Sequence, residues 1–127
     1  DFTGSDMSDT NLTSVNLGKA TLTRSSLGGA KVLNASMSGV EGIRMGAAKT
    51  EFQAVDMTKS MFFRAVFTEA VFRDVNFSKA EFSRANVLSG TSGLSQLQLD
   101  QACGDAGTVL PDGLARPAAW PCNGEDN

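Results

Sequence analysis

The sequence predicts an all-β solenoid, in which the backbone winds into stacked coils with short straight sides. Two columns of side chains lead to this prediction, one of large apolar residues and one of small residues. Each column repeats every five residues, and a period of five fits neither a helix nor a single strand.

The first column consists of large apolar residues, and seven of the eight phenylalanines lie on it; Phe63 alone does not. Chance would place about one phenylalanine in five there. We expect this column to form the core. Its members are Phe2, Met7, Leu12, Leu17, Leu22, Leu27, Val32, Met37, Phe52, Met57, Phe62, Phe67, Phe72, Phe77, Phe82 and Val87.

The second column lies two positions before the first and carries small residues. It runs from Ser5 to Ala85, one residue in each of seventeen consecutive pentads, and only Met45 breaks it. Five residues of helix leave a side chain about 140° from its starting direction, and a strand would send successive members to opposite faces. The backbone must therefore turn once every five residues, so that both columns return to one interior.

Several pentads carry a more specific pattern, an Ala-like residue followed by Asp or Asn, a large apolar residue and Ser or Thr. Examples are Thr10–Thr13, Val55–Thr58 and Val75–Ser78, and Ala20–Thr23 differs only in having Thr21 in the second position. The pattern resembles the pentapeptide-repeat family over residues 1–90. The resemblance implies a right-handed quadrilateral parallel β-helix with four pentads per coil. Eighteen pentads would give about four and a half coils, a rod roughly 20 Å long at the usual strand spacing.

Residues 40–49 depart from the family pattern, because Gly42 and Ala47 occupy consecutive positions of the large apolar column. With twenty residues per coil, Phe62 and Phe67 would lie beside them. We expect these rings and Met45, a side chain suited to irregular gaps, to fill the missing volume. A bulge or loop over residues 41–46 is the alternative.

The repeat stops near Gly90, so residues 91–127 are expected to form a C-terminal cap. A short helix over residues 94–102 would cover the end of the core, as terminal repeats require. The turn-rich remainder resembles a tail of bacterial members of the family, and we expect Trp120 to pack on the coil or its lid. At the other end the pattern is already in register at Phe2. We therefore expect upstream residues, a second copy or a partner to cover the first coil edge.

Among the apolar residues that lie off the two inward columns, five are expected to form an outward apolar area. They are Ile43, Met61, Phe63, Val66 and Val71. Water does not favour such an apolar area. Either the C-terminal segment folds over it or it binds a partner.

Basic residues line up when positions twenty residues apart are compared. One column holds Arg24, Arg44, Arg64 and Arg84, and the column one side earlier holds Lys19, Lys59 and Lys79 with Gly39 in the gap. At about 4.8 Å between coils they would form a strip that attracts an acidic protein surface, an anionic lipid face or a polyanion. The alternative is a solvated edge, relieved by Glu41, Asp56 and Glu81.

The composition argues against catalysis and against a cofactor or metal site. The chain has no histidine, no glycine-rich phosphate loop, and carboxylates that are dispersed over outward positions. Its two cysteines, Cys103 and Cys122, are too few for a zinc site. Paired, they would close a loop of about twenty residues, contribute up to ~3 kcal/mol and require an oxidising compartment. Two reduced thiols in the cytoplasm are the alternative.

These features predict a non-catalytic structural or protein-interaction module, an exported scaffold or accessory subunit. It would dock on a larger protein or membrane-associated assembly through the apolar area and the basic strip, and we expect no direct binding to nucleic acid. A bacterial periplasmic location would suit the disulfide, with the cytoplasm as the alternative. The best-known branch of the family suggests another function, inhibition of DNA gyrase by mimicry of double-stranded DNA. That mimicry needs an acidic rod, whereas residues 1–97 carry ten basic and nine acidic side chains.

Overall fold

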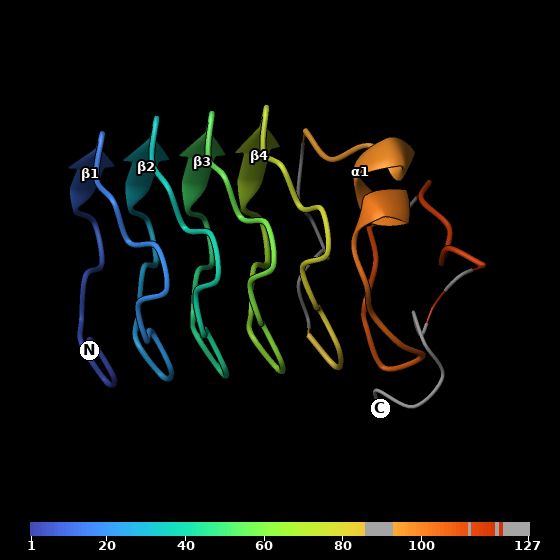
Figure 1. The fold of residues 1–127 in the computed structure, drawn as a ribbon, viewed down its shortest axis with the longest axis horizontal. Helices are drawn as coiled ribbons and strands as arrows, with labels where there is room; N and C mark the ends of the chain where they lie inside the picture. Colours follow the sequence, from blue (N-terminus) through green and yellow to red (C-terminus); the bar gives the residue numbers. More distant parts are fainter. Residues whose placement is uncertain (86–92, 112, 119, 121–127) are drawn as a thin grey trace.

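The computed structural model describes residues 1–85, 93–111, 113–118 and 120 of the 127-residue chain. Residues 1–85 form a right-handed parallel β-helix of square cross-section, and its coils stack side by side in Figure 1. One side of each coil is a short strand: β1 (Asn11–Thr13), β2 (Lys31–Leu33), β3 (Glu51–Gln53) and β4 (Val71–Arg73). They pair in parallel and in sequence order, each residue with the one twenty positions on.

The other three sides are held by single bridges in the same register, so four pentads make one coil as the family resemblance implied. We name the sides by the outward residues at their centres. The second side carries Asn16, Ser36, Asp56 and Asn76; the third carries Thr21, Glu41, Met61 and Glu81; the fourth carries Asp6, Ser26, Gly46 and Val66.

Each corner of the square contains a residue with positive φ, from Gly4 through to Arg84. Phe62–Ala65 represents the corners that follow the second, third and fourth sides: the Ala65 N–H donates to the Phe62 carbonyl oxygen at 3.0 Å, and Arg64 has φ of 59°. This geometry is that of a type II β-turn, whose third residue must adopt a left-handed conformation. The corner therefore lies two residues after each large apolar residue.

From Leu22 to Ala85 both inward columns form the buried core, as the sequence predicted. The predicted member Val87 lies outside the described residues. Six of the seven on-register phenylalanines are at most 1% exposed. Phe52 and Phe72 stack with ring centroids 5.3 Å apart, and Phe62 and Phe82 stack at 5.5 Å. Phe2 is the exception at 40% exposed, because it lies in the first coil, whose inward residues have coil on one side only. What covers that edge stays a prediction.

The packing compensation expected at residues 40–49 is confirmed at Gly42, and the filling of space beside Ala47 by Phe67 stays a prediction. Glu41 and Gly46 keep their bridges, so there is no bulge at these positions. A Cβ atom on Gly42 would come within 2.9 Å of Phe62 Cδ1 and 3.3 Å of Met45 Sδ. The Phe62 ring and the Met45 thioether therefore occupy the space that a larger side chain at position 42 would fill.

The cap contains a helix shorter than the predicted 94–102, α1 (Gln96–Gln101). Ser95 is its N-cap, in a capping box with Gln98, and Leu99 is buried. After the helix, Cys103 adds a further parallel bridge to Glu81 on the third side. Trp120 is buried and its Nε1–H donates to the Ala102 carbonyl oxygen at 2.8 Å. The expected boundary between residues 90 and 91 lies outside the described residues.

Candidate functional site

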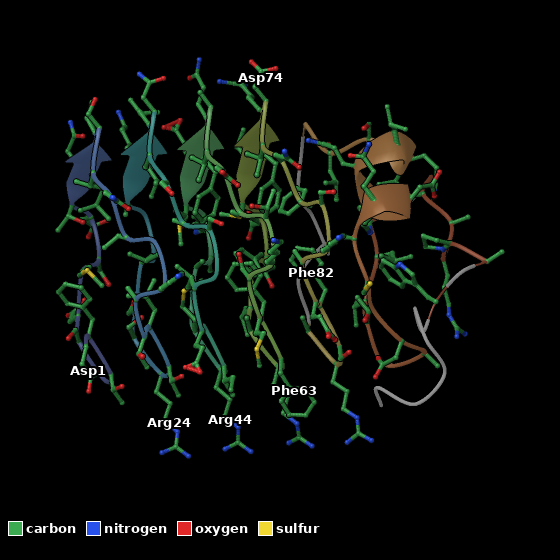
Figure 2. All side chains as sticks on the ribbon, viewed as in Figure 1. Asp1, Arg24, Arg44, Phe63, Asp74 and Phe82 are labelled. Carbon is green, nitrogen blue, oxygen red and sulfur yellow. The ribbon has the colours of Figure 1, made fainter. Side chains whose placement is uncertain are left out.

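Four arginines form a straight column along the corner between the third and fourth sides, which we call the arginine corner. It consists of Arg24, Arg44, Arg64 and Arg84, all exposed, with φ between 55° and 60°. In Figure 2, Arg24 and Arg44 point away from the coils at the edge opposite Asp74. Parallel strand spacing puts consecutive members about 4.8 Å apart.

Three lysines form the lysine corner, between the second and third sides. Lys19, Lys59 and Lys79 are exposed, with φ of 62°, 60° and 62°, and Gly39 occupies the gap with φ of 71°. The two corners therefore border the third side with seven cations. Glu41 and Glu81 lie between them on that side, so acidic groups partly offset the basic charge there.

The positions of the cations are not those that the backbone favours. Eight of the ten lysines and arginines in residues 1–85 occupy left-handed corners, where glycine or asparagine is preferred. An ordinary side chain in that conformation costs on the order of 1 kcal/mol relative to glycine. The sequence alone showed that the cations form columns, but not that they adopt the left-handed conformation. Their constant position, two residues after each large apolar residue, could have indicated it.

Three of the five predicted outward apolar residues gather at the arginine corner. Met61 is 43% exposed, Phe63 36% and Val66 38%, and they lie on the third side, the corner and the fourth side of one coil. The Arg64 guanidinium carbon lies 5.3 Å from the centroid of the Phe63 ring. The described part of the cap leaves these side chains exposed, so it does not cover them as one alternative required.

The other two predicted members fit less well. Ile43 lies beside Phe63, one coil earlier, but is half-buried. Val71 is half-buried in β4, on the strand side, and therefore lies around a further corner from the arginines. The expected single area is thus smaller than predicted, and Val71 is not part of it.

The residue before each large apolar residue has a local structural task where it is Asp or Asn. Asp56 Oδ1 accepts a hydrogen bond from the Thr58 N–H at 2.9 Å, and Asn76 Oδ1 accepts one from the Ser78 N–H at 2.9 Å. Hydrogen bonds from the Ser8 side chain and, secondly, from the Ser8 N–H lower the pKa of Asp6. These are Asx-turns, which stabilise the bend that follows.

Met61 and Val66 occupy the same pentad position and have no oxygen with which to accept such a bond. At both positions the chain therefore lacks a local hydrogen bond and exposes an apolar side chain instead. Compared with Asp or Asn at the same pentad position, neither the missing hydrogen bond nor the exposed apolar side chain stabilises the coil. Both therefore favour a role for these side chains outside the coil.

Within the described ranges no group of three His, Cys, Asp or Glu residues is placed to hold a metal ion, and no helix is long and apolar enough to cross a membrane. Cys103 is disulfide-bonded. Cys122 lies outside the described residues, so its pairing with Cys103 stays a prediction.

Comparison with solved structures gives likenesses at low identity. A pentapeptide-repeat protein, Rfr23, from the cyanobacterium Cyanothece 51142 is 18% identical, with a TM-score of 0.45 over 85% of this chain and 89% of that one. A pentapeptide-repeat protein of the Arabidopsis thaliana thylakoid lumen is 19% identical, with a TM-score of 0.31 over 72% and 78%. QnrB1, a plasmid-mediated fluoroquinolone resistance protein, is 15% identical, with a TM-score of 0.38 over 84% and 66%. No curated protein sequence matches.

Residues 1–29 and 50–87 match the description "Pentapeptide repeats" in eight copies, which is more than half of the chain. Residues 30–49 are not matched, and they include the irregular Gly42 and Ala47. The structure carries the coil through this segment in unbroken register. From the repeat match and the square β-helix together, the chain belongs to the pentapeptide-repeat family.

Proposed function

We propose that the protein is a non-catalytic interaction module that docks on a larger protein or membrane-associated assembly. Its docking surface comprises the arginine corner, the lysine corner and the exposed side chains of Met61, Phe63 and Val66. The observation that carries the proposal is the combination of seven exposed cations on adjacent corners with three exposed apolar side chains beside one of them.

The chemistry of this surface supports recognition better than catalysis. Arginine and aromatic side chains are enriched among the residues that dominate binding energies in protein interfaces. Columns of like charge attract an acidic surface over a distance, and this speeds association. These side chains point outward and are not the ones that the backbone favours. The arginines and lysines occupy left-handed corners where glycine is preferred, and Met61 and Val66 have no side-chain oxygen for an Asx-turn.

A paired substitution tests the docking surface without disturbing the core. Phe63→Ser with Arg64→Ser changes the two residues that follow Phe62 in the turn. Arg73→Ser with Asp74→Ser changes the corresponding two residues after Phe72, at the opposite edge, and is the matched control. In cross-linking within the source cells, we expect the wild-type protein and the control to give one specific adduct that the Phe63/Arg64 variant loses. Equal adduct formation by all three proteins would contradict the assignment of this surface.

Gyrase inhibition by DNA mimicry is the less favoured function. A mimic must replace the dense negative charge of the phosphate backbone, whereas this coil presents two basic corners. QnrB1 is similar at an identity that speaks for the fold alone. We expect the purified protein to leave gyrase supercoiling unchanged, and inhibition at equimolar protein would reverse this preference.

An exported location is part of the proposal. The disulfide-bonded state of Cys103 supports it, since disulfides persist in oxidising compartments such as the bacterial periplasm. Thiol labelling of unreduced protein from its source cells tests the location. We expect no free thiol, whereas two labelled cysteines would favour the cytoplasm.

A further inference from the structure

We propose that the arginine corner, together with the fourth side beside it, binds an anionic lipid surface. This inference rests on the proposed docking role and names the partner of one edge of that surface. Headgroup phosphates would bind the four arginines, and the acyl-chain boundary would receive Phe63 and Val66.

The arginine corner has the shape of a ridge. Its residues lie on an outer edge of the square coil, and Figure 2 shows Arg24, Arg44 and Phe63 projecting outward along one line. From Arg24 to Arg84 the ridge spans three coil repeats, about 14 Å at the parallel strand spacing. A projecting edge can sink between lipid headgroups, while the long arginine side chains keep their charge at phosphate level.

The fourth side makes the ridge able to lie on a surface. From Ser26 to Thr68 its outward residues are small or neutral and carry no charge. They are Ser26, Gly28, Gly46, Ala48, Val66 and Thr68. Beyond them, Val109 donates its N–H to the Ala85 carbonyl oxygen and is 44% exposed, which extends the neutral side past the last coil.

The acidic groups near the ridge fit this orientation. Glu41 and Glu81 lie on the third side and turn away from a membrane that touches the fourth. Asp105 Oδ1 already accepts hydrogen bonds from the Arg84 N–H at 3.1 Å and the Gly107 N–H at 2.9 Å. Asp6 belongs to the first coil, away from Phe63 and Val66. Asp9 and Glu69 lie on the far corner of the fourth side, with Lys49 between them. The basic ridge and the neutral side therefore face the same direction, and these two carboxylates lie at the edge away from the arginines.

A lipid surface accounts for both the arginines and the exposed apolar side chains beside them. A soluble polyanion would use the arginines but leave Phe63 and Val66 without a role. A protein partner would have to hold carboxylates in a matching line about 4.8 Å apart, where they would repel one another. Anionic headgroups form a continuous and fluid layer that needs no register, and basic clusters beside apolar side chains are the usual signature of surface attachment.

Sedimentation with lipid vesicles tests the proposal on the full chain. Vesicles of phosphatidylcholine alone are compared with vesicles that also contain about 30 mol% phosphatidylserine. The test variant is Arg44→Asn with Arg64→Asn, and the matched control is Lys59→Asn with Lys79→Asn. Both variants remove two charges from left-handed corners, and asparagine tolerates that conformation.

We expect the wild-type protein to bind only the anionic vesicles, and the arginine variant to bind them roughly 30-fold more weakly, the factor for two cations at an anionic surface. The lysine variant should change less than about threefold, because its corner faces away. Equal losses in both variants would show attraction by overall charge and would overturn the proposal.

A fluorescent variant tests insertion separately. Phe63→Trp should shift its emission to shorter wavelength with anionic vesicles, measured as the difference from the wild-type protein, whose single tryptophan, Trp120, is buried. No shift would overturn the proposal, and so would equally tight binding to inorganic polyphosphate, which would make the ligand a soluble polyanion. If the wild-type protein failed to bind anionic vesicles but still gave the specific cross-linked adduct, this inference would be wrong and the docking proposal would stand. If the wild-type protein bound anionic vesicles but gave no cross-linked adduct, the proposal of a protein partner would be wrong and this inference would stand.

Discussion

Substitution of Gly42 by alanine is expected to destabilise the coil, although alanine is normally the more stable residue outside left-handed positions. The new Cβ would lie 2.9 Å and 3.2 Å from two atoms of the Phe62 ring and 3.3 Å from Met45 Sδ. Overpacking of a buried site costs about 1–3 kcal/mol. The reduced entropy of the unfolded chain returns about 0.4–1 kcal/mol. The free energy of unfolding should therefore fall by about 1–2 kcal/mol.

A double-mutant cycle with Phe62→Leu identifies the cause. Leucine is smaller than phenylalanine, so Gly42→Ala should be neutral or slightly stabilising in that background, and the coupling energy should reach about 1–2 kcal/mol. Urea unfolding followed by far-UV circular dichroism provides the four free energies. The reasoning would be refuted if Gly42→Ala cost the same with phenylalanine or leucine at position 62, since the ring would then not occupy the space.

Three further substitutions have predictable effects on stability or on the cap. Val66→Asn should restore an Asx-turn and raise the free energy of unfolding by about 0.5–1 kcal/mol, measured as a higher urea midpoint. Lys49→Gly, at a corner with φ of 61°, should stabilise by up to about 1 kcal/mol by the same measurement, and a loss at either site would contradict the turn assignments. Gly104→Ala would place a Cβ 2.5 Å from the Trp120 ring. It should therefore shift tryptophan emission to longer wavelength while the far-UV spectrum of the coil stays unchanged.

The coil could be predicted from sequence because its core is one-dimensional. Each turn buries the same two columns, so position in the pentad alone decides whether a side chain faces inward. The same logic predicted that Phe62 would compensate for Gly42, since residues twenty apart are neighbours. A globular core offers no such rule, because its neighbours depend on loops that sequence periodicity does not describe.

The cap shows where that logic ends. Beyond the repeat no column fixes the register, so the bridge between Cys103 and Glu81 had no sequence signal. The helix start did have one, because Ser95 and Gln98 stand at capping-box spacing, and this would have moved the predicted start from residue 94. Val71 was wrongly grouped with Met61 and Phe63 because outward direction was considered without asking which side of the square each residue occupies.

The residues at the corners allow the requirements of folding to be distinguished from those of binding. A coil selected only for stability would place glycine or asparagine at left-handed corners and Asp or Asn before each large apolar residue. This chain instead places arginine at four successive turns of one corner, and Met61 and Val66 beside them. The corner between the fourth and first sides carries mixed charges, Asp9, Lys49 and Glu69, and the corner between the first and second sides carries Asp74 as its only charge. The left-handed backbone alone therefore does not account for the two columns of one sign. Residues that the backbone does not favour thus recur with the same sign of charge along the arginine corner and the lysine corner, and this consistency is the reason for proposing them as a binding surface.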